Sequence, residues 1–142
     1  MEKIRIMASN TVRHRTSLEN LACTWPRAAT ILGAVIANLV IWAISTYVGQ
    51  VDLHVNGTDV GPVLVAGVTL LAGLVAWGLL AFLERRMANA WKIWRNIALA
   101  VLVISMIGPL GADEALGKTT LSLMHVFAGA IIIKGFSNTV RK

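Results

Sequence analysis

Four long apolar stretches, separated by short polar segments, set the hydrophobic pattern of the chain. They cover approximately 28–49, 62–83, 93–110 and 119–136, and the first two carry no formal charge. A helix rises about 1.5 Å per residue, so roughly 20 residues cross the ~30 Å hydrocarbon core of a bilayer. Each stretch has about that length, and we therefore predict four transmembrane helices.

The polar segments between these stretches contain turn signals. Residues 51–55 alternate between apolar and polar, and Asn56-Gly57 follows them, which predicts a small hairpin. Gly108-Pro109, near the end of the third stretch, predicts a bend or a helix end, because proline has no N–H to donate. Short connections favour antiparallel neighbours, so the predicted fold is all-α, a four-transmembrane-helix up-down bundle.

The 13 Lys and Arg residues divide unequally between the two ends of the predicted helices. Five lie in the N-terminal segment through Arg27, four in the basic hinge 81–95, and three from Lys134 onward. Lys118 alone lies on the opposite side. Because cytoplasmic loops are rich in Lys and Arg, we predict that both termini are cytoplasmic.

Composition supports a membrane protein. Hydrophobic residues make up 56% of the chain and charged residues only 14%, whereas soluble domains have roughly 25% charged residues. The net charge of +6 does not indicate nucleic-acid binding, because the basic residues lie at the ends of apolar runs and form no separate basic face. The predicted plan is a basic cytoplasmic tail 1–24, a membrane domain 25–138 and a cytoplasmic end 139–142, with the lipid bilayer as partner.

Polar side chains inside the apolar stretches are the candidate functional positions, because unpaired polar groups are costly in hydrocarbon. The helical rise places Asn38, Ser105 and Trp42 at ~15, ~18 and ~21 Å from the cytoplasmic end. It places Thr69 and His125 at ~20 Å from the outer surface. We predict that Trp42, Thr69, Ser105 and His125 form a polar layer, one residue from each helix. Asn38, Trp42, Thr69 and Ser105 are the candidate ligand-binding residues.

Two residues are candidates for acid–base catalysis. The imidazole of His125 can transfer protons, although it can equally be a neutral side chain bonded to Ser105, Thr69 or a backbone carbonyl. Glu84 is either an acid or base at a cavity mouth or one half of an ion pair that joins the second helix to the third or fourth. No metal or cofactor is expected, because a lone histidine lacks the ligand cluster that a metal needs.

Two further patterns concern packing. Trp91 and Trp94, in the basic hinge, are predicted to anchor the chain at the membrane surface. In the second stretch, small residues such as Ala72 and Ala76 recur four apart, which lets helix backbones approach closely. This spacing predicts either tight packing within one chain or the face of a homodimer.

Several runs resemble a family of small four-helix integral membrane proteins from actinobacteria that has no assigned function. The runs are LLAFLERR, W-x-x-W, IALAVLVISMIGPLGA and LSLMHVFAGAIII, within residues 28–136. The most specific pieces are Leu83-Glu84-Arg85, Gly108-Pro109-Leu110 and Met124-His125. The resemblance implies a four-helix fold in a bacterial inner membrane, and it implies no activity.

Three classes of function fit these observations. The first is a non-enzymatic membrane protein that binds a lipophilic small molecule or a membrane partner. The second is a small membrane-embedded enzyme, an isomerase or cyclase of an apolar metabolite, that uses His125 or Glu84 as acid or base. The third is one subunit of an oligomeric transporter. The sequence leaves open which class applies, and it identifies neither the ligand nor the oligomeric state.

Overall fold

A computed structural model describes residues 24–51, 53–55, 57–112 and 114–140. It contains four helices that are long and apolar enough to cross a membrane: a first helix Thr24–Val48, α2 Pro62–Arg86, the combined span Ala90–Leu110, and α5 Ala115–Ser137. The prediction of an all-α, four-helix membrane protein is confirmed. Residues 1–23 of the predicted tail, and the last two residues, lie outside the described residues.

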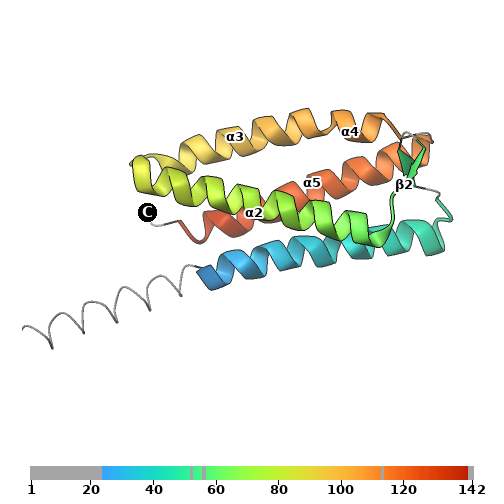
Figure 1. Cartoon of the computed structure of the whole chain (residues 1–142), viewed down its shortest axis with the longest axis horizontal. Coiled ribbons are helices and arrows are strands. Elements are labelled where there is room, and N and C mark those ends of the chain that lie inside the picture. The colour runs from blue at the N-terminus through green and yellow to red at the C-terminus, as the bar shows by residue number, and fades with distance from the viewer. Residues whose placement is uncertain (1–23, 52, 56, 113, 141–142) are drawn as a thin grey trace, which may run out of the picture.

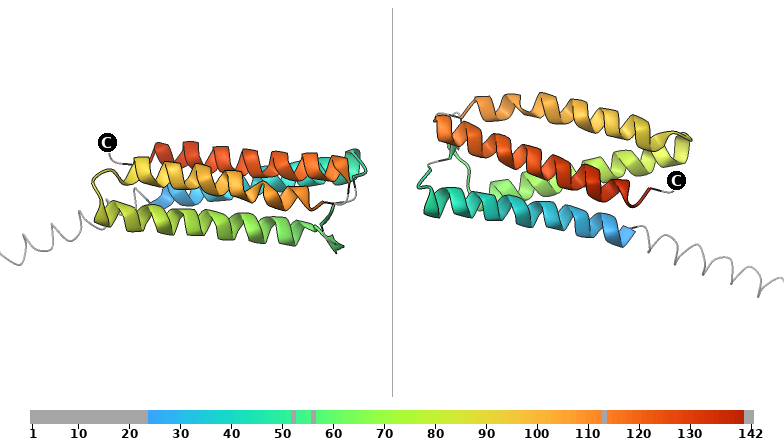
Figure 2. Two further views of the ribbon diagram at one scale, coloured as in Figure 1. Left: turned by 90° about the horizontal axis from the view of Figure 1, so that it is seen from above. Right: turned by 180° about the vertical axis from the view of Figure 1, so that it is seen from behind.

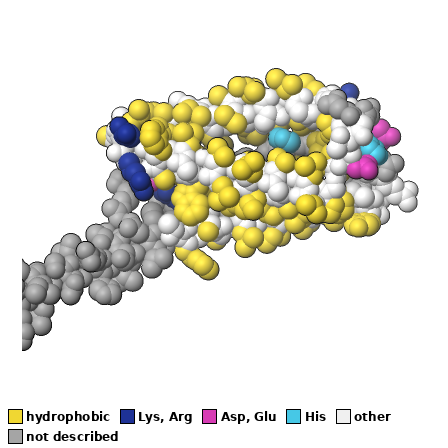
Figure 3. All heavy atoms as spheres, viewed as in Figure 1, with side chains coloured by type: hydrophobic (Ala, Val, Ile, Leu, Met, Phe, Trp, Pro, Cys, Tyr) yellow, Lys and Arg dark blue, Asp and Glu magenta, His cyan; other side chains and the backbone are white. Residues whose placement is uncertain are grey.

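The four helices lie side by side as one elongated bundle (Figures 1 and 2). The start of the first helix, the turn from α2 to α3 and the C-terminal end lie together at one end, and the small hairpin lies at the other (Figure 1). In the space-filling view, dark blue Lys and Arg side chains gather mainly at the first of these ends, and yellow apolar side chains cover the middle (Figure 3). We call the first end the basic end and the second the hairpin end.

Each helix turns a narrow stripe of residues toward the bundle. The buried residues of the first helix recur every three or four positions: Arg27, Ile31, Ala34 and Asn38. In α2 the corresponding residues are Val65, Thr69, Gly73, Leu80 and Leu83. This spacing is the helical period, so one face of each helix packs while the other, mostly apolar, faces outward as it must in lipid.

Two apolar clusters make up the core, one above the other. The inner cluster, near the basic end, includes Ile31, Ala34, Leu80, Trp94 and Phe136. The outer cluster, near the hairpin end, includes Val51, Leu53, Val65, Leu121 and Met124. In the first helix and α2, Asn38 and Thr69 are the buried polar residues between the clusters.

A short hairpin covers the hairpin end of the bundle. Strands β1 (His54–Val55) and β2 (Thr58–Asp59) pair antiparallel, and Gly57 between them has a φ of 74°, which glycine adopts without strain. Val55 also bridges to Ala112, which joins the hairpin to the loop before α5. The hairpin predicted from the alternation and the turn dipeptide is therefore present.

The third span is broken near its end. It consists of α3 (Ala90–Ser105) and α4 (Ile107–Leu110), with Met106 between them. Pro109 has no N–H for the carbonyl of Ser105 four residues earlier, which explains an interruption at this place. This span is also the least covered, because only 11% of its most apolar window is buried, against 28% for α5.

The position of Trp94 contradicts the prediction that this residue is an anchor at the membrane surface. Its side chain is 1% exposed, stacks on Trp91 at 5.3 Å between ring centroids, and donates from Nε1 to the carbonyl of Ala76 at 2.8 Å. It is a core residue that ties α3 to α2 rather than a surface anchor. The tryptophan ring is large enough to fill the inner cluster, and its one polar atom is bonded.

The small residues of α2 divide between two faces. Gly73 packs directly on the first helix, because a Cβ there would lie 2.7 Å from Cγ2 of Ile31. Gly67, Ala72 and Gly78 are exposed on the outer face, and a Cβ at either glycine would meet nothing within 4 Å. Close packing within the chain thus accounts for Gly73 and leaves the other three unexplained.

Candidate ligand site between the two core clusters

The first helix and α2 are joined at mid-depth by a polar pair. Nδ2 of Asn38 donates to Oγ1 of Thr69 at 3.0 Å, and Oγ1 of Thr69 donates to the carbonyl of Val65 at 2.7 Å. The two side chains belong to residues that are 6% and 7% exposed. The Thr69 hydroxyl thus accepts one hydrogen bond and donates another.

The carbonyl oxygen of Asn38 has no such partner. Oδ1 is buried and accepts no hydrogen bond from the described part of the chain. Buried polar atoms are nearly always bonded, and an unsatisfied one costs about 1–3 kcal/mol. Oδ1 of Asn38 is therefore a buried acceptor whose hydrogen-bonding capacity is unused within the described residues.

His125 lies on α5, on the side that faces α3. Gly129, one turn further along, packs against Leu102 of α3, which sets the register of the two helices. Nδ1 of His125 lies 2.9 Å from the carbonyl of Leu121. A carbonyl can only accept, so Nδ1 carries the hydrogen, and the lone pair of a neutral imidazole then resides on Nε2. Among the described residues no partner for Nε2 is found.

In the described part of the chain, no hydrogen bond joins two members of the predicted polar layer, Trp42, Thr69, Ser105 and His125. Trp42 donates from Nε1 to the carbonyl of Val60 at 2.8 Å and so holds the connection after the hairpin. The Ser105 hydroxyl donates to the carbonyl of Leu102 in its own helix at 2.8 Å. The described structure therefore brings together Asn38 and Thr69, while Trp42, Ser105 and His125 each bond to backbone and not to one another.

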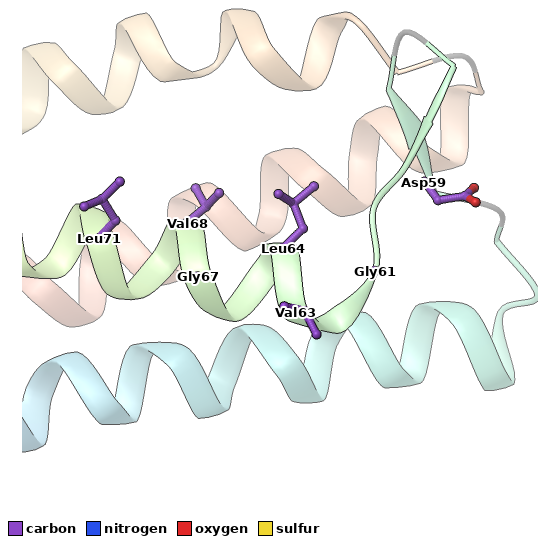
Figure 4. Close-up of a pocket in the computed structure, with 7 residues that line it drawn as sticks. All are labelled: Asp59, Gly61, Val63, Leu64, Gly67, Val68 and Leu71. Carbon is purple, nitrogen blue, oxygen red and sulfur yellow. The ribbon is translucent and has the colours of Figure 1, made fainter.

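An open apolar groove leads along α2 toward this level. It has a volume of about 500 Å³ and is lined by Val63, Leu64, Gly67, Val68 and Leu71, with Asp59 at its hairpin end. Figure 4 shows Leu64, Val68 and Leu71 pointing to the same side of α2. On the face seen in Figure 3 the surface is hollowed between α2 and the α3–α4 span, and histidine atoms are visible in the hollow.

Glu84 lies at the basic end, within an ion pair. Its carboxylate accepts from Nη1 and Nη2 of Arg27 at 3.0 and 2.6 Å, and Nε of Arg27 donates to Oγ1 of Thr139 at 3.0 Å. The Arg27 side chain is 5% exposed and that of Glu84 is 30% exposed. The expected partner on the third or fourth helix is wrong: the ion pair joins α2 to the first helix, and Thr139 adds the segment after α5.

Arg27 was missed as a site residue because its charge was assigned to the topology of the N-terminal segment. The spacing could have revealed it, since it stands four residues before Ile31 on the inward face. His54 and Asp59 form a second close pair, 2.7 Å apart, on the exposed hairpin. Across the described ranges, no three His, Cys, Asp or Glu side chains lie together as metal ligands would.

A family model places these features in context. A family of unknown function, DUF6069, matches residues 20–142. The chain belongs to this family. The match covers the whole membrane domain and agrees with the sequence resemblance to proteins without an assigned function. No curated protein and no solved structure matches the chain. The activity has to be argued from the site itself.

Proposed function

We propose that this multi-pass membrane protein binds a lipophilic small molecule between its two core clusters. The observation that carries the proposal is the buried, unbonded Oδ1 of Asn38. A bundle that only had to pack could use leucine at this position, which has nearly the same size and no polar atom. A buried acceptor that stays open is expected where a ligand supplies the donor.

We infer a route to the site from the side of the bundle, along the groove on α2 that reaches the level of Thr69. At the hairpin end, Val51, Leu53 and Ala112 are buried beneath the hairpin. At the basic end, Trp94, Phe136 and the Arg27–Glu84 pair fill the interior. The apolar groove along α2 is open, so a molecule dissolved in the hydrocarbon can reach it without crossing water.

A membrane-embedded isomerase or cyclase is the second candidate, because Nε2 of His125 is available to take a proton. Glu84 supports this candidate less well, since Arg27 holds both of its carboxylate oxygens. A transporter subunit has the weakest support, because both ends of the single bundle are filled. In every version two further points belong to the proposal. The cytoplasmic position of the termini is inferred from the Lys and Arg distribution, and the bacterial inner membrane is implied by the sequence resemblance.

Photolabelling tests the proposed binding. The full chain in lipid nanodiscs is irradiated with a long-chain fatty alcohol that carries a diazirine, and the labelled peptides are identified. We expect labelling of α2 and α5 in the half near the hairpin, which saturates as the probe concentration rises. Labelling that rises without saturation and spreads evenly over all outward faces would contradict the proposal.

Two matched variants locate the route. Gly67→Phe places a ring in the groove, whereas Gly78→Phe makes the same change on the same helix, outside the groove lining. We expect Gly67→Phe to reduce saturable labelling several-fold and Gly78→Phe to leave it unchanged. Equal labelling of both variants would show that the groove is not the route.

A further inference from the structure

Four hydrogen-bond donors around the two core clusters are already engaged. The hydroxyl of Thr69 donates to Val65, and the hydroxyl of Ser105 donates to Leu102. Nε1 of Trp42 donates to Val60, and Nδ1 of His125 to Leu121. Each of these groups is bonded to a backbone carbonyl. They hold the local structure and have no hydrogen left for a ligand.

Two hydrogen-bond acceptors near this level have no partner among the described residues. Oδ1 of Asn38 is open, and Nε2 of a neutral His125 carries a lone pair. The second amide hydrogen of Asn38 is also without a partner among the described residues. A ligand that only accepts hydrogen bonds would leave Oδ1 unsatisfied.

The two acceptors lie at similar depth. Arg27 beside Thr139, and Thr30 against Gly135, fix the register of the first helix along α5. Continued at the helical rise, this register places Asn38 about one turn, or ~5 Å along the axis, from the level of His125. The outer cluster agrees with this register, because Trp42 packs against the cluster that contains Met124.

The charges around the site further restrict the chemical class of the ligand. The acidic side chains in the described ranges lie at the two ends of the bundle. Asp59 and Glu114 are exposed at the hairpin end, where Asp59 is paired with His54, and Glu84 is paired with Arg27 at the basic end. An ammonium group would therefore enter hydrocarbon without a counter-charge, and a carboxylate would face two acceptors. A neutral hydroxyl avoids both costs, since it donates to an acceptor and remains uncharged.

We propose that the ligand is a neutral alcohol or phenol with an apolar body, whose hydroxyl donates to Oδ1 of Asn38, and that Nε2 of His125 receives a second donor where the ligand has one. This inference rests on the proposed binding function. It selects the chemical class of the ligand by its donor, while the groove along α2 accepts the apolar body.

The test compares three diazirine probes of equal chain length on the unmodified full chain in nanodiscs: the fatty alcohol, its methyl ether and the fatty acid. The ether keeps the oxygen and loses the donor. We expect the alcohol to reach half-saturation at about tenfold lower concentration than the ether, since one hydrogen bond to a buried acceptor separates them. We expect the acid, ionised at neutral pH, to label no better than the ether.

Asn38→Leu identifies the acceptor. Leucine fills nearly the same space, and Thr69 keeps its own bond to Val65. We expect this variant to bind alcohol and ether equally, at the level at which the unmodified chain binds the ether. Ser137→Ala is the control, because the Ser137 hydroxyl bonds only to the carbonyl of Lys134 in its own helix, at the basic end, and this variant should keep the preference for the alcohol.

The outcomes separate the two proposals. Saturable labelling in the groove with no preference between alcohol and ether overturns the inference about the ligand and leaves the binding function standing. A preference that survives in Asn38→Leu overturns the assignment of the acceptor. The absence of saturable labelling by all three probes overturns both proposals. The probe comparison needs no variant, so it remains decisive even if Asn38→Leu does not fold.

Discussion

Arg27 shows how a single charged residue is accommodated in this bundle. Moving a guanidinium and a carboxylate out of water is costly, and their attraction offsets that cost only when the geometry is good and the other donors are bonded. Here both carboxylate oxygens of Glu84 are paired, and the third guanidinium nitrogen reaches Thr139. Removing one partner is therefore more damaging than removing both.

We predict that Arg27→Met lowers the free energy of unfolding by about 2 kcal/mol. This is below the 3–5 kcal/mol typical of a broken buried pair, because the Glu84 side chain is 30% exposed and water can solvate it. Unfolding followed in detergent measures the change. The double variant Arg27→Met with Glu84→Leu should recover most of the loss. Arg85→Met, at an exposed neighbouring position, should change the free energy of unfolding by less than about 0.5 kcal/mol.

In the ligand-free protein, replacing Asn38 should change the free energy of unfolding in the opposite direction. Asn38→Leu removes a buried, unsatisfied oxygen, so it should raise the free energy of unfolding by about 1 kcal/mol. Thr69→Val should lower it by a similar amount, because it takes away the partner of Nδ2. Both variants are compared by thermal unfolding in the same detergent. A loss of stability in Asn38→Leu would mean that Oδ1 is already bonded, for example to a buried water.

At the scale of single elements, α2 carries two kinds of glycine. Gly73 lies where Ile31 leaves no room for a side chain, whereas Gly78 faces open space. A glycine inside a helix costs roughly 0.5–1 kcal/mol relative to alanine, and that cost is justified by packing only at the first position. The sequence alone does not separate them, because both stand in an uninterrupted apolar helix.

We predict that Gly73→Ala and Gly78→Ala change stability in opposite directions. Gly73→Ala forces the first helix away from α2 and should destabilise the bundle by about 1–3 kcal/mol, as overpacking does elsewhere. Gly78→Ala should be neutral or stabilising by up to about 1 kcal/mol. Thermal unfolding of the two variants side by side is the measurement, and equal effects would show that the helices do not pack as described.

The W-x-x-W segment shows where sequence reasoning about an element stops. Residues three apart fall on nearly the same side of a helix, so the spacing predicts that Trp91 and Trp94 act together, and their rings do stack. The sequence could not tell which ring enters the core, because this depends on how α3 is rotated against α2. Trp94 is the ring that enters the core, because it lies opposite Ala76 and its Nε1 donates to the Ala76 carbonyl.

At the scale of the molecule, the number and class of helices could be read from the sequence, because bilayer thickness dictates apolar length. The site could be read only in part. Asn38, Thr69 and His125 were found because polar residues stand out in apolar runs. A backbone carbonyl was among the expected partners of His125, whereas the pairing of Asn38 with Thr69 was not predicted, since it depends on the rotation and order of the helices, which apolar length does not specify. The Arg27–Glu84 pair was missed for the same reason.

The orientation in the membrane is predicted from the Lys and Arg residues at the basic end. In a Cys23→Ser background, Gly57→Cys on the hairpin should react with a membrane-impermeant maleimide added to intact cells. Ala88→Cys, exposed at the turn between α2 and α3, should react only after the cells are lysed. The reverse pattern would place the hairpin in the cytoplasm and invert the proposed topology.

The contact between Arg27 and Thr139 also has a consequence for biogenesis. Arg27 is synthesised early, and its guanidinium meets Glu84 only after α2 emerges and Thr139 only after the last span. During translation the first helix therefore enters the membrane before either partner of Arg27 has been made. The full hydrogen-bond set of this arginine exists only once the last span is in place.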